Sequence, residues 1–186
     1  RVLNLLTHAL GLGPVGSFFP ICVSLVNIRT FHPADAGAVR LLFAQSMMDF
    51  AGNSAQAVES YVESSLADDL ADISFHYLRL PGDHFWVAEV EGQIKGMVGI
   101  QRNDEKEAEL RCMSVAKGAR RQGIGWALLE TTESFCREQG YQQIRLTTVT
   151  LLQPAIAMYT RFGYRLAGED QYGEIAGQHF VKQLDG

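Results

Sequence analysis

Hydrophobic and polar positions alternate with a period of two in seven short segments of the chain. This period is typical of strands that pack one face against a core, because successive side chains point to opposite faces. Glu91 and Gly92 separate two of these segments and predict a tight hairpin. The predicted strands are residues 26–30, 85–90, 94–101, 108–115, 143–149, 164–168 and 178–184.

Apolar residues spaced three and four positions apart predict helices between these strands. Asn53 and Ser54 are candidate caps for the second helix, and Pro81 and Gly82 mark a loop after it. The predicted helices cover residues 33–50, 55 to about 73, 121–140 and 154–162. The residues expected to face the core include Leu41, Leu42, Tyr61, Leu70, Ile124, Ala127, Leu128, Thr131 and Phe135.

The predicted order is a strand, two helices, three strands, a helix, a strand, a helix and two strands. The three central strands form a meander and must be antiparallel. The helix over 121–140 is a crossover, so the strands on either side of it should be parallel or splayed. The predicted fold class is therefore α/β (α+β), with a mixed, centrally splayed sheet of about seven strands and helices on both faces.

Composition indicates one ordinary globular domain. The chain has 186 residues, of which 47% are hydrophobic, and a net charge of −5. This balance does not favour a nucleic-acid-binding surface, which needs an excess of Lys and Arg. An acidic group in the second helix is expected mainly to form a solvated helix face, with attraction of a cationic substrate as the alternative. Its members are Glu59, Glu63, Asp68, Asp69 and Asp72.

Cysteine and histidine usage predicts free thiols and no metal site. Cys22, Cys112 and Cys136 are odd in number and match no disulfide or zinc spacing. Buried free thiols suit a reducing compartment, so a cytoplasmic location is expected. The five histidines are scattered along the chain.

The N-terminal part stands apart from the rest. Ala9–Val26 carries no charge and is near the minimum length of a membrane span, about 17–25 residues. Glycines and prolines interrupt it, which favours a packed extension or a stretch foreign to the natural protein over a signal or anchor. We therefore divide the chain into an apolar extension over 1–24 and a domain over 25–186, and keep a membrane-anchored form as an alternative.

The segment Met113–Glu130 carries the strongest chemical signal. A strand ends at Val115, a basic turn follows, and Gly123 and Gly125 are expected in the first turn of the next helix. Glycine there costs about 1 kcal/mol relative to alanine. Free amides at a helix N-terminus attract an anion, and missing side chains let a phosphate approach. The alternative is that the glycines only permit close packing between helix and sheet.

Two other nucleotide-binding motifs are excluded. A Walker loop needs Lys and then Ser or Thr after its last glycine, but Trp126 and Ala127 follow Gly125. The three-glycine spacing of a dinucleotide fingerprint is also absent.

Two motifs resemble those of a known family. Residues 120–125 match its signature (Gln/Arg)-x-x-Gly-x-(Gly/Ala), and 155–164 is similar to its second signature, with Ala155, Tyr159 and a glycine–aromatic pair. The chain resembles the GNAT superfamily of N-acetyltransferases from about Val26 to Leu184. The surroundings of 147–153 are weakly similar to its N-acetyltransferase 8 subgroup.

This resemblance implies acetyl-CoA as cosubstrate and a role for each matched residue. Tyr159 is expected to protonate the leaving thiolate. Glu109 is expected to take a proton from the acceptor, because only a neutral amine attacks a thioester. Leu152 stands where many relatives have asparagine, so Thr148 and Gln153 are candidates to replace that amide. The expected cosubstrate-binding residues are Met113, Ser114, Val115, Arg120, Arg121, Gln122, Gly123, Ile124, Gly125, Trp126 and Gln153.

The predicted function is transfer of an acetyl group from acetyl-CoA to a primary amine by direct attack. The acceptor should be recognised by 33–73, the loop 74–84 and the segment near 170–178. Alternatives are a non-catalytic acyl-CoA-binding sensor and a covalent acyl-enzyme on Cys112, although a strand cysteine is usually a small buried hydrophobe. A homodimer is compatible with the sequence.

Overall fold

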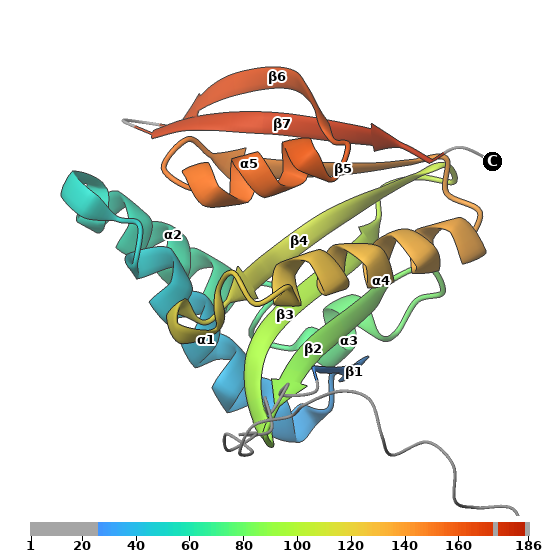
Figure 1. Cartoon of the computed structure of the whole chain (residues 1–186), viewed down its shortest axis with the longest axis horizontal. Helices are drawn as coiled ribbons and strands as arrows, with labels where there is room; N and C mark the ends of the chain where they lie inside the picture. Colours follow the sequence, from blue (N-terminus) through green and yellow to red (C-terminus); the bar gives the residue numbers. More distant parts are fainter. Residues whose placement is uncertain (1–25, 173–174, 185–186) are drawn as a thin grey trace, which may run out of the picture.

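Seven strands in the described residues form one mixed sheet with the order β1-β2-β3-β4-β5-β7-β6 (Figure 1). The computed structural model describes residues 26–172 and 175–184. The strands are β1 (Asn27–Thr30), β2 (His84–Val90), β3 (Gln93–Arg102), β4 (Glu107–Val115), β5 (Gln143–Val149), β6 (Arg165–Tyr172) and β7 (Ile175–Gln183).

The sheet divides between β4 and β5. These two strands are parallel and pair only from Glu107–Leu110 to Gln143–Leu146. Every other neighbouring pair is antiparallel. Beyond Leu110 the strand β4 pairs only with β3, so the two halves of the sheet diverge. The predicted splay and the predicted α/β class are thus confirmed.

Helices cover both faces of the sheet (Figure 1). One core lies under α4 and α5 and contains Leu128, Ile144 and Tyr164. The other lies under α1 and α2 and contains Val39, Phe43 and Met97. The helices are α1 (Ala36–Met48), α2 (Ala55–Ala67), α3 (Ile73–Tyr77), α4 (Ile124–Glu138) and α5 (Gln153–Arg161), with short 3-10 turns η1 (Pro33–Asp35), η2 (Gly52–Ser54) and η3 (Lys117–Ala119).

The second predicted helix is wrong at its C-terminal end. The helix α2 ends at Ala67, and a separate helix α3 begins at Ile73, where a loop was expected. The side chain of Asp72 accepts a hydrogen bond from the Phe75 amide at 3.0 Å, so an aspartate expected in the last turn of one helix caps a new helix instead. Ser54 precedes α2 but makes no side-chain capping bond.

Arg40 explains how the break after α2 is held. Its Nη1 donates to the carbonyls of Leu66 and Leu70 at 2.9 and 2.7 Å. Carbonyls at a helix C-terminus have no partner within the helix, so a guanidinium there stabilises the end.

Two core faces differ from the predicted ones. Leu41 and Tyr61, expected to face the core, are 58% and 57% exposed. In α4 the fully buried stripe is turned by about one residue and runs through Leu129, Thr132 and Cys136. Ala127, Thr131 and Phe135 lie half-buried at its border because the sheet, and not the helix alone, fixes the helix orientation.

The C-terminal hairpin is longer than predicted. The strands β6 and β7 pair from Arg165–Val181 to Tyr172–Ile175, with a register shift between Leu166 and Gly168. The added residues carry many polar side chains, so the alternation of hydrophobic positions does not extend over them.

The apolar segment over 9–26 lies outside the described residues except for Val26, so the division at residues 24 and 25 stays a prediction. Within the part that the structure describes, no helix has the length and apolar character needed to cross a membrane.

Candidate active site

A cavity of about 540 Å³ opens where β4 and β5 diverge. Its floor is formed by the two strands, and its walls come from α1, α2, α5 and the start of β7. The expected acceptor-binding regions 33–73 and 170–178 contribute residues to this lining, but 74–84 contributes none of the described ones. The lining includes Tyr61, Asp69, Glu109, Arg111, Cys112, Met113, Thr147, Thr148, Leu152 and Tyr159.

A bulge in β4 shapes the cavity floor. The register with β3 shifts between Met97 and Gly99, and Cys112 has a φ of 53° in the left-handed region. A bulge bends its strand and redirects the side chains beside it. Gly99 lies opposite this bend, where a Cβ atom would come within 2.6 Å of the Tyr77 ring. Glycine at this position therefore lets Tyr77 pack directly on β3.

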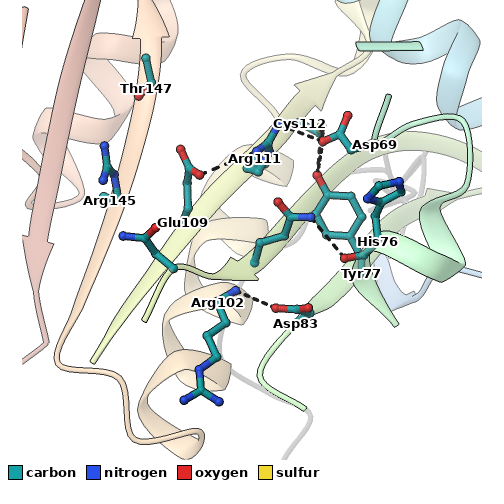
Figure 2. A network of polar contacts seen from close by, with 12 residues as sticks. Asp69, His76, Tyr77, Asp83, Arg102, Glu109, Arg111, Cys112, Arg145 and Thr147 are labelled. Carbon is teal, nitrogen blue, oxygen red and sulfur yellow. Dashed lines mark hydrogen bonds and ion pairs between the residues drawn. The ribbon is translucent and has the colours of Figure 1, made fainter. Parts of the chain in front are cut away.

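Figure 2 shows a polar network on the cavity side of this bulge. Arg111 lies between two carboxylates, with Nη2 at 3.3 Å from Asp69 and Nη1 at 3.8 Å from Glu109. The Tyr77 hydroxyl donates to Asp69 at 2.5 Å, and the Cys112 thiol lies 3.5 Å from the same carboxylate. Glu109 and Arg111 remain 29% and 37% exposed, so the charged end of the network faces the cavity.

Asp69 corrects a prediction. It was assigned to a solvated helix face, yet its side chain is only 5% exposed, in the turn after α2. A buried carboxylate needs ionic or hydrogen-bonding partners, which Arg111 and Tyr77 supply. The sequence signal was weak, because Tyr77 stood in an expected loop. The alternation that places Arg111 on the face of Glu109 was the only usable hint. Glu59, Glu63, Asp68 and Asp72 are exposed as expected.

The surroundings of Cys112 do not favour a covalent intermediate. Burial, together with the neighbouring Asp69 carboxylate, raises the pKa of the Cys112 thiol to about 12. A nucleophilic cysteine needs a thiolate near neutral pH, and this site stabilises the thiol.

We expect both described thiols to resist alkylation in the native protein. Burial also raises the pKa of Cys136 to about 12, from an ordinary 9.0. Since the thiolate is the reacting form, native Cys112 and Cys136 should react with iodoacetamide at least about 100-fold more slowly than in unfolded protein. Mass spectrometry of the digested protein measures the alkylation of each cysteine separately, so that labelling of Cys22 does not obscure the result. Fast labelling of native Cys112 would revive the acyl-enzyme alternative.

Tyr159 projects from α5 into the cavity lining. Its side chain is buried, and its ring meets that of Tyr164 edge-on with centroids 5.8 Å apart. Burial, followed by the nearby Tyr61, raises the pKa of the Tyr159 phenol above its ordinary value of 10.0. This phenol therefore keeps its proton across the physiological range, as a proton donor must.

The glycine turn differs in detail from the prediction. The helix α4 begins at Ile124 and not at Arg121, and Gly123 is its N-cap, with a φ of 85°. Arg121 also has positive φ, at 63°. The first helical bond runs from the Ala127 amide to the Gly123 carbonyl at 3.0 Å, and no side chain caps the helix. Amides before that bond have no acceptor within the helix, which makes this end suited to an anion.

Gly125 and Trp126 hold the turn against α5. A Cβ atom on Gly125 would lie 2.8 Å from the Met158 sulfur, so this glycine permits close helix packing as well as open backbone. The Trp126 ring meets Phe162 edge-on at 4.8 Å and donates from Nε1 to Glu130 at 2.8 Å. The structure thus supports both interpretations of the glycines, an open backbone for an anion and close packing of the helix.

Arg120 points toward α1. Its Nη2 bonds Asp49 at 2.7 Å, its Nε donates to the Val115 carbonyl at 3.0 Å, and its guanidinium lies 4.6 Å from the centre of the Phe50 ring. Lys117 lies 3.6 Å from the same carboxylate. Asp49 therefore offsets much of the positive charge expected at the turn, while Arg121 and Gln122 remain exposed there.

The proposed replacements for asparagine lie in different places. Thr148 and Leu152 line the cavity. Gln153 is exposed at the start of α5, and its amide donates to the Thr150 carbonyl at 2.7 Å, which stabilises its own turn. Met113 lines the cavity on the β4 side, and Val115 ends that strand.

Ser114 is buried, and its hydroxyl makes no hydrogen bond among the described residues. An unsatisfied buried hydroxyl costs stability, so Ser114→Ala should raise the free energy of unfolding by ~1 kcal/mol in urea titrations. Ser46→Ala is the matched control and should give no such gain, because the Ser46 hydroxyl donates to the Phe43 carbonyl at 3.0 Å. A loss of stability in Ser114→Ala would contradict the prediction.

Two diverging strands, a bulged strand at their junction and a glycine turn before a helix can hold an extended anionic ligand between the halves of one sheet. Within the described residues, no group of His, Cys, Asp and Glu is arranged to hold a metal ion.

The chain belongs to the acetyltransferase (GNAT) family, whose sequence model matches residues 51–164. It is 40% identical over 114 residues to N-acetyltransferase 8 of Homo sapiens, covering 59% of this chain and 50% of that protein. It is 35% identical over 125 residues to N-acetylaspartate synthetase of Danio rerio, covering 67% and 44%. The chain thus spans about half the length of these curated relatives.

Solved acetyltransferase structures share the fold. A GNAT acetyltransferase from Staphylococcus aureus Mu50 superposes with a TM-score of 0.72 at 22% identity, over 87% of this chain and all of that one. The PaiA N-acetyltransferase of Thermoplasma acidophilum, solved with coenzyme A, gives 0.71 at 17% identity, over 86% and 99%. The resemblance inferred from the two motifs is confirmed at the level of family and fold.

Proposed function

We propose that this protein transfers an acetyl group from acetyl-CoA to a primary amine by direct attack. The observation that carries the proposal is the cavity at the splay of β4 and β5, because it brings Glu109 and Tyr159 into one lining. Glu109 lies on β4 and Tyr159 on the helix α5, fifty positions apart in the chain. A base for the amine and an acid for the thiolate are the two groups that this reaction needs.

The cosubstrate fits the geometry on both sides of the cavity. Uncapped amides at the start of α4 suit a pyrophosphate, and β4 beyond Leu110 has a free edge toward β5. An extended pantetheine arm can pair with that edge through Met113, Ser114 and Val115. Residues 120–126 would then hold the phosphates mainly through backbone amides, since Asp49 engages the Arg120 side chain.

In the reaction, Glu109 takes a proton from the acceptor ammonium and the neutral amine attacks the thioester carbonyl. An amide N–H beside the β4 bulge would bind the oxyanion of the tetrahedral intermediate. Collapse breaks the carbon–sulfur bond, and Tyr159 gives its proton to the departing thiolate. The second proton on the attacking nitrogen then returns to Tyr159, directly or through water, so that the product is a neutral amide and Glu109 holds the one remaining proton.

The test follows thiol release from acetyl-CoA with polyamines, free amino acids, cysteine conjugates and lysine peptides. Calorimetric binding of CoA is measured in parallel. Release that depends on one amine class supports the transferase and identifies its acceptor. CoA binding without release from any amine favours the sensor alternative, and absence of CoA binding would refute the assignment of 120–126.

We further propose a cytoplasmic location, on the ground that Cys112 and Cys136 are free thiols. An anchored form through residues 9–26 remains the alternative, and detergent partitioning of the full chain separates the two. A homodimer is a second proposal, tested by light scattering. We expect no nucleic-acid partner, given the net charge of −5.

A further inference from the structure

Three polar side chains on neighbouring strands form a hydrogen-bonded row outside the Glu109 network. Thr147 Oγ1 on β5 lies 2.9 Å from His179 Nδ1 on β7, and His179 Nε2 lies 2.7 Å from Asp170 Oδ2 on β6. Thr147 and His179 are direct partners in the antiparallel pair. Gly168 is the β6 partner of His179 and has no side chain, so Asp170 reaches the imidazole from the next position on that face.

The row runs from the rim of the cavity to the outer edge of the sheet. Thr147 belongs to the cavity lining, together with Glu109, and is itself exposed at the rim. The His179 side chain is 23% exposed, and Asp170 at the outer end is 63% exposed. Figure 2 shows Arg145 and Thr147 on β5 beside Glu109 on β4. The register pairs Glu109 with Arg145, and Thr147 follows two positions later, where the strands have begun to diverge.

The hydrogen positions follow from the donors available. An ionised Asp170 can only accept, so His179 Nε2 carries the hydrogen of that bond. His179 Nδ1 then carries no hydrogen, and its lone pair accepts a hydrogen bond from the Thr147 hydroxyl. The lone pairs of Thr147 Oγ1 stay free to accept a proton from the cavity side. This is the donor order of a hydroxyl–imidazole–carboxylate relay.

We propose that Thr147, His179 and Asp170 carry to solvent the proton that Glu109 removes from the acceptor amine. The proposal rests on the proposed function. Glu109 returns its proton to Thr147 Oγ1, directly or through water, while the Thr147 proton moves to His179 Nδ1. Asp170 stabilises the imidazolium, which releases one proton to water at its exposed edge, and solvent exchange restores the tautomer. The net change is one proton from amine to water, and no bond to carbon is involved.

Among the described residues, other charged side chains face the row from β4, β5 and β6. Arg145 on β5 and Arg165 on β6 lie on the same face of the sheet, and Arg111 faces the cavity with Glu109 from β4. The cations oppose an imidazolium and Asp170 favours it, so the carboxylate is the partner on which the relay depends.

The first experiment compares His179→Gln and Thr147→Val with wild type in the acceptor assay. Each should lower kcat by ~10-fold, less than loss of a direct base, with the acceptor KM and the CoA Kd changed by less than about twofold. The double variant should be no worse than either single one, and Thr147→Ser should keep wild-type kcat. Imidazole in the buffer should restore His179→Ala.

His84→Gln is the matched control. His84 is half-buried and bonds the Thr30 hydroxyl at 2.9 Å across β1 and β2, but it does not line the cavity. It should keep wild-type kcat. If His179→Gln behaves as His84→Gln does while Glu109→Gln is impaired, the relay is wrong and the proposed function stands. Additive losses without imidazole rescue would also overturn the relay. A wild type that acetylates no amine overturns both.

Discussion

Glu109→Gln should lower kcat for acetyl transfer near neutral pH by about 100-fold or more, the effect expected for loss of a general base. Glutamine keeps the shape of the side chain but cannot take a proton. Glu109 is suited to the role because its side chain is 29% exposed at the cavity and lies 3.8 Å from Arg111. Steady-state thiol release measures the change.

The deficit of Glu109→Gln should shrink as pH rises. A typical lysine amine has a pKa of about 10.4, so an increasing share of the acceptor arrives already neutral and needs no base. A deficit of the same size near pH 7 and pH 9.5 would contradict the role assigned to Glu109.

Glu107→Gln is the control on the same strand and face. Glu107 is buried, accepts from Asn103 at 2.5 Å and from Gln143, and pairs with Arg145 at 3.5 Å. Weakening these bonds should cost about 1–3 kcal/mol of unfolding free energy. Its kcat should stay near wild type because it lies outside the cavity lining. The two roles are therefore separated by two measurements. Glu109→Gln should lose kcat, and Glu107→Gln should lose free energy of unfolding.

The sequence was a good guide where one local rule decided the structure. The hairpin at Glu91 and Gly92 and the crossover after β4 follow from turn chemistry and chain connectivity, so the mixed, splayed sheet could be predicted. It failed where two local rules competed. Asp72 can continue a helix face or cap a new helix, and the contacts of Arg40 with Leu66 and Leu70 favour the break.

Prediction of the site residues from the sequence was also limited. Glu109 and Tyr159 could be proposed because they stand at fixed spacing from recognisable motifs. Asp69 could not, because its burial depends on Arg111 from a strand more than forty positions away. The resemblance implies Arg120 as a cosubstrate-binding residue, and only the fold shows that its guanidinium is bonded to Asp49. Ion pairs between distant segments produce no periodic pattern in a single sequence, so they could not be predicted from it.

Tyr159→Phe should lower kcat by about 10- to 100-fold, because phenylalanine fills the same space without a proton for the leaving thiolate. The melting temperature should hardly move, since the edge-on contact with Tyr164 at 5.8 Å involves the ring and not the hydroxyl. Single-turnover release of CoA reports the step directly. If the melting temperature of Tyr159→Phe falls clearly along with its rate of CoA release, the loss of rate would be explained by damaged packing and not by a missing proton donor.

The pH profile gives a second, independent check on Tyr159. Burial disfavours the phenolate and so raises the pKa of this group above its ordinary value of 10.0. The proton is therefore held at pH values where an exposed tyrosine begins to lose it. Wild-type kcat should show no fall up to about pH 10, the range in which a solvated phenol would begin to ionise. An alkaline loss near pH 9, present in wild type and absent in Tyr159→Phe, would show instead that the phenol is solvated during turnover.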